Sequence, residues 1–483
     1  MNPIEQMSLS MTAEPIDLHA LLAAQRQAHA SDPLPDAATR RDRLDRLRRL
    51  GFDHAREIAQ AISDDYGHRP WQETLVAEFA MFDERLRFSR RRLAGWMKRR
   101  RVPTTFHYGL ASNWQMPQPL GVVGVLSPWN YPFDLCMAPT IDALAAGNRV
   151  MIKPSELTPR FSALLQQLVA QAFDPAELVV VPGDAELAAR FSALPFDHLI
   201  FTGSTTVGRK VAAAAAPNLT PLTLELGGKS PVLVAPDCNL ERAAERLAWG
   251  KLLNAGQTCI APDYVLAPRD KIPALCRALE QAMARMYPSL ARNPDYCSII
   301  SPRHLGRLHA LLDDARALGA QVHTINPAQE SFDAASQKMA PTLVTGTTAA
   351  MRLMQEEIFG PILPIVPYDD FAQALDAVAA GERPLALYWF GEDKRLLEDT
   401  LKRTVSGGVS VNDCLLHVSQ LHQPFGGVGA SGQGAHHGQR GFEAFSHLKP
   451  IFVQTRWHGM NLVSPPYGRL LESAWRFVTG KGR

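Results

Sequence analysis

The chain has 483 residues, too many for one simple hydrophobic core, so we expect at least two domains. Its 50 Lys and Arg residues almost balance 48 Asp and Glu residues, and a net charge of +2 excludes a general attraction to nucleic acids or membrane surfaces. Six scattered cysteines without a Cys-x-x-Cys pair indicate reduced thiols in a cytoplasmic protein, with neither disulfides nor a metal site.

The first part of the chain is expected to be helical, because apolar side chains recur at three- and four-residue spacing between about 17 and 102. Pro103 should end this helical part, and an extended polar stretch follows to Pro119. Basic residues crowd positions 85–101. Nucleic-acid binding is one interpretation, but no nucleic-acid motif accompanies them, so a solvated helix face or a subunit contact is favoured.

From residue 120 the pattern changes to short apolar runs that alternate with helical stretches, which predicts a parallel, doubly wound sheet. The expected strands are 121–126, 149–153, 178–181, 198–201 and 222–226. The expected helices are 134–146, 159–172, 185–191 and 206–216. Ligands of such sheets bind at the carboxyl ends of the strands.

A second alternating block covers residues 230–407, with apolar strands such as PVLVAP and PILPIV. A glycine-rich stretch, PFGGVGASGQG (424–434), follows it, and the chain ends in a short amphipathic tail. The N-terminal sequence lacks the charged-then-apolar pattern of a secretion signal, and the apolar runs are far shorter than the ~20 residues of a spanning helix. We therefore expect no membrane partner.

Cys259 is the first candidate for catalytic chemistry. A lone cysteine is usually a small buried apolar residue. In NAGQTCIAP, however, the neighbours are small and polar, with Gly256 three residues before and Pro262 three residues after. This setting predicts a thiol that is accessible in a cleft.

Glu225 is the second candidate, because LTLELGGKS places a carboxylate inside an apolar strand. Desolvation there should raise its pKa, which suits a general base. The alternative is a strand-end glutamate that is paired with Lys229 or solvated.

Asn130 follows the first strand in LSPWNYP, where its amide could donate to a developing oxyanion, although a turn asparagine is the plain alternative. The turn at Gly203 and Ser204 precedes a helix whose free N–H groups could hold a pyrophosphate. Lys153 and Glu156 leave the neighbouring strand and could bind a ribose. The usual G-x-G-x-x-G fingerprint is missing, and an ordinary helix cap explains Ser204 equally well.

Taken in order, these motifs resemble the aldehyde dehydrogenase superfamily between about residues 20 and 450: PWNYP, KPSE, FTGST, LELGGKSP, GQTC, EEIFGP and PFGGVGASG. Residues 219–266 and FSHLKP are similar to its class 3 branch. Within that branch, SGGVSVNDCLLHVSQ (406–420) resembles the bacterial coniferyl aldehyde dehydrogenase group.

The resemblance implies NAD(P)-dependent oxidation of an aldehyde to a carboxylic acid, with Cys259 as nucleophile, Glu225 as base and Asn130 as oxyanion donor. It implies cofactor contacts by a further set of residues: Lys153 and Glu156 at the adenosine ribose, Gly203 and Ser204 at the pyrophosphate, Val207 and Gly208 at the adenine, Glu357 at the nicotinamide ribose and Phe359 near its ring. Glu156 should favour NAD over NADP, although NADP use stays open.

By the same resemblance, the substrate pocket is lined by Tyr131, Leu135, Leu253 and His417, which suits an aromatic aldehyde such as coniferyl aldehyde or a medium-chain apolar one. Two residues depart from the family pattern: Gln433 and His436 stand where methionine and tyrosine are common. These departures bear on local packing or a subunit contact. The tail after Trp457 lacks the long hydrophobic anchor of membrane-bound class 3 members.

The implied domain plan is a Rossmann-like cofactor domain, a second α/β catalytic domain and a small β element for homodimerisation. The corresponding ranges are 1–102 with 120–226, 227–407, and 103–119 with 441–456, plus a return segment 408–440 and a tail 457–483. A CoA-acylating enzyme generally lacks the base glutamate, so Glu225 argues against one. A non-catalytic binding or structural protein is disfavoured because no catalytic position is lost.

Overall fold

The computed structural model describes residues 17–108, 110–456, 458 and 464–480. Residues 1–16 of the predicted cofactor segment and part of the predicted tail lie outside the described residues. In the described part, the strands form three sheets: one of six strands, one of seven and one of three. The predicted α/β fold is confirmed.

The N-terminal part is helical, as expected. Its helices are α1 (Leu18–Ser31), α2 (Ala37–Asp53), α3 (Ala55–Tyr66), α4 (Trp71–Thr74) and α5 (Ala80–Trp96), with a π-helical turn, η2 (Leu75–Phe79), before α5. Asp17 and Asp36 cap α1 and α2 by accepting backbone N–H groups. The expectation that the helical part continues to Pro103 is wrong, because α5 ends at Trp96 and a strand begins at Arg100.

The first sheet has the order β15-β7-β6-β3-β4-β5 and is parallel except for its short edge strand β15. Its strands are β3 (Val122–Leu126), β4 (Arg149–Lys153), β5 (Leu178–Val180), β6 (His198–Thr202), β7 (Leu222–Glu225) and β15 (Gly432–Gln433). The crossover helices are α6 (Pro132–Ala146), α7 (Pro159–Ala172), α8 (Ala185–Ser192) and α9 (Thr205–Ala215). The predicted elements agree with these to within two residues at each end.

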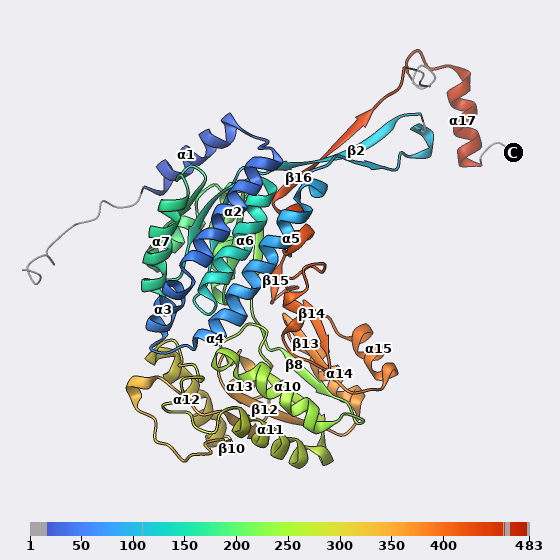
Figure 1. Ribbon diagram of the computed structural model, residues 1–483. Coiled ribbons are helices and arrows are strands. Elements are labelled where there is room, and N and C mark those ends of the chain that lie inside the picture. Colours follow the sequence, from blue (N-terminus) through green and yellow to red (C-terminus); the bar gives the residue numbers. More distant parts are fainter. Residues whose placement is uncertain (1–16, 109, 457, 459–463, 481–483) are drawn as a thin grey trace, which may run out of the picture.

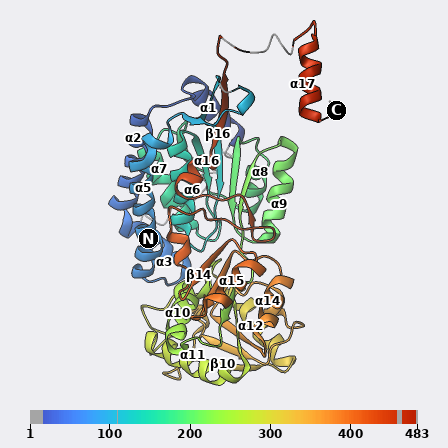
Figure 2. The same cartoon turned by 90° about the vertical axis from the view of Figure 1, so that its right-hand side faces the viewer.

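Both faces of the first sheet are covered, which explains the unbroken apolar runs of its strands. Val123 and Val125 of β3 enter one core with the helices α2, α5, α6 and α7. Val122 and Leu126 point to the other face, where they pack with α1, α8 and α9. Figure 2 shows these two helical layers on either side of the sheet.

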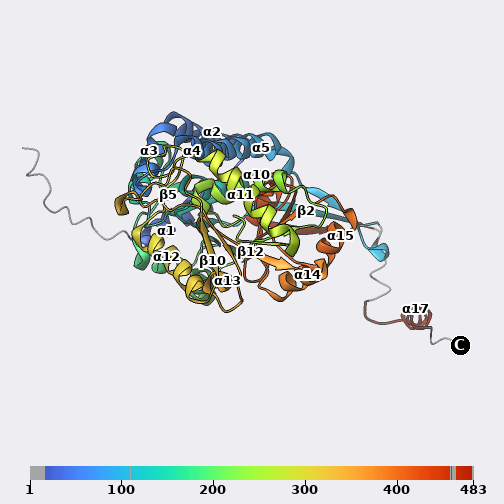
Figure 3. The same cartoon turned by 90° about the horizontal axis from the view of Figure 1, so that it is seen from below.

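The second sheet has the order β10-β11-β12-β9-β8-β13-β14. Its strands are β8 (Pro231–Val234), β9 (Tyr264–Pro268), β10 (Gln321–Thr324), β11 (Thr342–Thr345), β12 (Ile362–Tyr368), β13 (Ala386–Phe390) and β14 (Gly408–Val411). The associated helices are α10 (Leu240–Leu252), α11 (Ile272–Met286), α12 (Pro302–Ala317), α13 (Arg352–Gln355), α14 (Phe371–Ala380) and α15 (Lys394–Arg403). Seen from below, α10 and α11 lie on one side of β12 and α14 on the other (Figure 3).

The glycine-rich segment 408–440 joins the two large sheets, because it supplies β14 to the second and β15 to the first. Its β15 pairs antiparallel with β7, so that Gly432 lies opposite Glu225. A Cβ on Gly432 would lie 2.4 Å from the Leu224 carbonyl oxygen, so this close pairing requires glycine.

The third sheet is a long arm made of β1 (Arg100–Val102), β2 (Ser112–Pro119) and β16 (Ser446–Val453), which follows α16 (Gly438–Ala444). Figure 1 shows β2 and β16 extending away from the body, with α17 (Arg469–Thr479) beyond the tip. No helix in the described ranges has the length and apolar character of a membrane crossing.

Candidate active site

The carboxyl ends of the first sheet bring several predicted site residues to one edge. Lys153 and Glu225 are the last residues of β4 and β7. Asn130 follows β3, while Gly203 and Ser204 follow β6. Because these strands are parallel and adjacent, the side chains share the edge where α/β sheets bind ligands.

The loop that carries Cys259 comes from the second sheet, between α10 and β9. Two side-chain contacts hold it against the loop after β3: Asn130 Nδ2 donates to the Gln257 carbonyl over 3.1 Å, and the Tyr131 and Thr258 hydroxyl oxygens are 2.6 Å apart. The thiol therefore lies where the two sheets meet.

Cys259 is half-buried and packs against the core of the second sheet, in the same cluster as Leu253 and Phe425. Burial, with smaller contributions from the charges of Glu357 and Glu225, raises the pKa of the Cys259 thiol to about 12. At neutral pH the thiol is protonated, so its proton must be removed before or during attack.

Glu225 is 2% exposed, and neither of its carboxylate oxygens has a hydrogen-bond partner among the described residues. Burial raises the pKa of Glu225 well above its usual value, as the sequence predicted. The alternative pairing with Lys229 is excluded, because Lys229 forms an ion pair with Asp263 and donates to the Leu353 carbonyl over 2.8 Å. Glu225 is thus a buried acid without a structural partner.

Glu357 reaches the same region from the loop between α13 and β12. A Cβ on Gly227 would lie 2.3 Å from Glu357 Oε2, so the carboxyl group occupies space that only glycine leaves open. Burial raises the pKa of Glu357 to about 8, with a further contribution from Asp263. Phe359 has a left-handed φ of 52°, and its ring meets Trp129 edge-on with centroids 5.4 Å apart.

The N-terminus of α9 was expected either to bind a pyrophosphate with its free N–H groups or to carry an ordinary N-cap at Ser204. Ser204 Oγ accepts the Val207 N–H over 3.4 Å, so the cap interpretation is confirmed. Val207 is 43% exposed, an apolar surface in the first turn of the helix. Gly208 has a packing role, because a Cβ there would lie 2.6 Å from Leu226 Cδ2.

Lys153 is buried at the end of β4, and its ammonium group is 3.5 Å from the exposed carboxylate of Glu156. In the sheet, β3 lies between β4, which ends in Lys153, and β6, which leads into the turn before α9. The Lys153 ammonium group can donate hydrogen bonds to a ribose, and the exposed Glu156 carboxylate can accept them. The residues present therefore fit an adenine dinucleotide.

The four predicted pocket residues come from two parts of the chain. Tyr131 and Leu135 lie at the start of α6, whereas Leu253 and His417 belong to the second-sheet side. His417 Nδ1 is 2.9 Å from Ser410 Oγ, and burial lowers the His417 pKa to about 4, so its ring is neutral.

Residues 4–451 match the family described as the aldehyde dehydrogenase family. The chain belongs to the aldehyde dehydrogenase family. It is 48% identical over 456 residues to the coniferyl aldehyde dehydrogenase of Pseudomonas sp. strain HR199, which covers 94% of each chain. It is 37% identical over 431 residues to a Rattus norvegicus protein named aldehyde dehydrogenase, dimeric NADP-preferring, covering 89% of this chain and 93% of the relative.

Among solved structures, the chain is similar to the substrate-bound state of AldH from Staphylococcus aureus, with a TM-score of 0.90 and 33% identity. That alignment covers 96% of this chain and 100% of the other. The protein is accordingly an oxidoreductase that acts on aldehydes, and the resemblance read from the ordered motifs is confirmed.

The two departures from the family pattern have different positions in this aldehyde dehydrogenase. Gln433 is exposed in β15. His436 is buried, with Nδ1 3.6 Å from Asp142 Oδ2 and its ring 4.3 Å from the ring of His437. His436 is therefore part of the internal packing of the chain.

The basic run 85–101 is not a uniform cationic face. Arg85 is buried in an ion pair with Asp134. On the surface, Arg90 Nε is 2.7 Å from Asp45 Oδ1, and other arginines of the run also have acidic partners. Acidic partners therefore neutralise part of the run.

Sequence reasoning missed the residues that support the site from behind. Asn254 and Ala255 both have left-handed backbones, with φ of 53° and 51°, in the turn that leads to Cys259. Arg69 and Glu78 form a fully buried ion pair of 2.9 Å close to Asn130. Only the Asn-Ala-Gly sequence hinted at the first feature, since asparagine and glycine tolerate left-handed backbone.

Proposed function

We propose that this aldehyde dehydrogenase oxidises an aromatic aldehyde of the coniferyl type, or a medium-chain apolar aldehyde, to its carboxylic acid through a thioester on Cys259. The observation that carries the mechanism is that Glu225, a buried carboxyl group without a hydrogen-bond partner among the described residues, lies within electrostatic reach of the half-buried Cys259 thiol. The relative named coniferyl aldehyde dehydrogenase supports the substrate class, for which the proposed pocket residues Tyr131 and His417 would supply an aromatic lining.

In the first half of the cycle, the Cys259 thiol loses its proton to solvent and its Sγ attacks the aldehyde carbon. The oxyanion accepts hydrogen bonds from Asn130 Nδ2 and the Cys259 backbone N–H. Asn130 Nδ2 has two hydrogens and uses one on the Gln257 carbonyl, which leaves the second for the substrate. NAD(P), when bound, supplies the hydride acceptor that turns the thiohemiacetal into a thioester.

In the second half, Glu225 takes a proton from water, and the resulting hydroxide attacks the thioester carbon. The C–S bond breaks, Cys259 recovers its proton and the carboxylic acid leaves. An unpaired buried carboxyl group suits this proton transfer, because no fixed cation holds it in one charge state.

We infer that NAD is the preferred cofactor. Lys153 and Glu156 would hold the adenosine ribose, and the exposed Glu156 carboxylate would repel a 2′-phosphate. Gly203 and Ser204 would approach the pyrophosphate, Val207 and Gly208 the adenine, and Glu357 with Phe359 the nicotinamide riboside. The rat relative that is named NADP-preferring makes NADP the necessary comparison.

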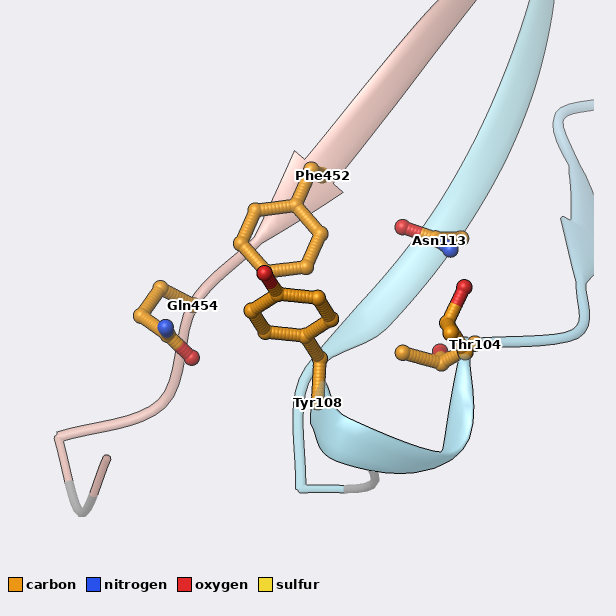
Figure 4. A pocket seen from close by; sticks show the side chains of 6 residues that line it. Thr104, Tyr108, Asn113, Phe452 and Gln454 are labelled. Carbon is orange, nitrogen blue, oxygen red and sulfur yellow. The ribbon is translucent and has the colours of Figure 1, made fainter. Parts of the chain in front are cut away.

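We also propose a cytoplasmic homodimer that forms through the β2–β16 arm. Next to the body, where β2 and β16 pair without β1, the arm is only two strands wide, and such a ribbon is marginal in water, so the arm needs a partner surface. At its tip, the rings of Tyr108 and Phe452 meet edge-on 5.8 Å apart, beside a shallow pocket lined by Thr104, Asn113 and Gln454 (Figure 4). The relative named dimeric supports the same stoichiometry.

The test follows NAD(P)H absorbance with coniferyl aldehyde, benzaldehyde, hexanal and acetaldehyde, each with NAD and NADP. The proposal expects turnover with NAD, a higher kcat/KM for coniferyl aldehyde than for acetaldehyde, and no turnover by Cys259→Ala. Acetaldehyde as the best substrate would contradict the substrate class. Formation of acyl-CoA when CoA is added would contradict the proposed hydrolysis and show that the enzyme transfers the acyl group to CoA.

A further inference from the structure

The side chain of Asn254 connects the loop of the proposed oxyanion donor to the loop of the proposed nucleophile. Its Nδ2 donates to the Asn130 carbonyl over 2.9 Å and to the Gln257 carbonyl over 3.2 Å. The Gln257 carbonyl also accepts from Asn130 Nδ2 over 3.1 Å. One amide thus closes a small ring of hydrogen bonds that joins two segments more than 120 residues apart.

The Asn130 carbonyl is held from more than one side. Among the described residues it accepts from the Tyr66 hydroxyl over 2.9 Å and from Arg69 Nη1 over 3.2 Å, in addition to Asn254. Tyr66 and Arg69 belong to the helical layer, so only Asn254 ties this carbonyl to the Cys259 loop. Together with the direct contacts of Asn130 with Gln257 and of Tyr131 with Thr258, Asn254 therefore fixes the separation between the two proposed oxyanion donors, which lie on different loops.

Asn254 itself has little freedom to move. It is fully buried, and its backbone is left-handed, with φ 53° and ψ 33°. Its backbone N–H donates to Glu73 Oε2 over 3.2 Å, and its Oδ1 accepts from Cys297 Sγ over 3.3 Å. Because the backbone, the amide nitrogen and the amide oxygen are all bonded, the side chain is fixed in one orientation.

We propose that Asn254 is a positioning residue for the oxyanion: it sets the Asn130 amide and the Cys259 backbone N–H at the separation that the tetrahedral intermediate requires. This inference rests on the proposed roles of Asn130 and Cys259. Preorganised donors matter most where charge develops, so a small displacement of one donor slows the carbonyl chemistry while it leaves other reactions of the thiol alone.

The experiment uses Asn254→Gly, which keeps the left-handed backbone and removes the amide, with Asn254→Asp as a second variant that keeps the shape and loses the donor. We expect kcat/KM for aldehydes to fall by about 10- to 100-fold. Alkylation of Cys259 by iodoacetamide, which develops no oxyanion, should stay within about twofold of the wild-type rate. A purely structural role would reduce both.

A double-mutant cycle with Asn130→Ala gives the decisive readout. If Asn254 acts through Asn130, Asn254→Gly should change the rate of Asn130→Ala by less than about twofold. The matched control is Asn412→Gly, since Asn412 also has a left-handed φ of 56° and its Nδ2 donates to the Gly391 carbonyl over 2.9 Å, just after the ends of β13 and β14. We expect the control to retain the wild-type rate.

Multiplicative losses in the double variant, or equal losses of aldehyde oxidation and alkylation, would overturn the inference and leave the proposed function intact. A wild-type rate for Asn254→Gly and Asn254→Asp would also overturn it. A wild-type rate for Asn130→Ala would instead remove the proposed oxyanion donor, and with it this inference, while Cys259→Ala would still report separately on the thiol mechanism.

Discussion

The Glu225 carboxylate lies close enough to the Cys259 thiol for its charge to raise the pKa of that thiol. Each group is also desolvated, and burial opposes the charged form of both. The nucleophile and the base of the proposed cycle are therefore electrostatically linked, so that ionisation of one opposes ionisation of the other.

This linkage predicts that Glu225→Gln lowers the pKa of the Cys259 thiol, because the variant removes a negative charge from its surroundings. The shift should be smaller than the effect of burial, which is the largest cause of the raised pKa. The measurement is the rate of Cys259 alkylation from pH 6 to 11. Glu245→Gln, an exposed glutamate paired with Arg285, serves as the control and should leave the profile unchanged.

The pH dependence of turnover should follow Glu225. A general base acts only when it is ionised, and the pKa of Glu225 is raised well above its usual value. Thioester hydrolysis should therefore accelerate as pH rises through that raised pKa and be slow at pH 5. Steady-state kcat from pH 5 to 10, with the NADH burst measured separately, checks this. A kcat that is flat from pH 5 upward would mean that Glu225 has an ordinary pKa.

Cofactor choice should respond to Glu156. Replacing its exposed carboxylate by an amide in Glu156→Gln removes the repulsion of a 2′-phosphate while keeping a hydrogen-bonding group. The ratio of kcat/KM for NADP over NAD should rise by about tenfold, which corresponds to ~1.4 kcal/mol. Glu186→Gln, in the first turn of α8, is the control. An unchanged ratio would show that Glu156 does not face the ribose.

Stability should depend on the buried ion pair behind the site. Glu78 pairs with Arg69 over 2.9 Å, and it also accepts the first N–H groups of α6, from Phe133 and Asp134. Glu78→Ala leaves a buried guanidinium and two N–H groups without this partner, so we expect a loss of about 3–5 kcal/mol in the free energy of unfolding. Urea unfolding measures it, and the exposed Glu84→Ala on α5 should cost little. Equal midpoints for the two variants would contradict the prediction.

The helices and strands of the first sheet could be predicted closely because their boundaries depend on residues that are adjacent in the sequence. A strand covered on both faces reads as an unbroken apolar run, so β4 was located at residues 149–153 without error. Cys259 and Glu225 could also be predicted from their sequence neighbours, since the cysteine follows small polar residues and the glutamate lies in an apolar strand. The end of α5 at Trp96 was misplaced because the arginines after it continue the helical pattern but enter β1.

The support of the site could not be predicted, because each partner is distant in sequence. Asn254 bonds Asn130 across 124 residues, and Glu78 caps α6 across 55. The pairing of Lys229 with Asp263 rather than Glu225 depends equally on how the two sheets meet. No periodicity or local composition encodes such contacts.

The central claim is that Cys259 carries the acyl group and that Glu225 releases it. The most direct measurement mixes Glu225→Gln with coniferyl aldehyde and NAD and records NADH by stopped flow and the protein by intact mass spectrometry. We expect about one equivalent of NADH per site, then arrest, with one acyl group retained on Cys259. Continued wild-type turnover with no acyl adduct would contradict it.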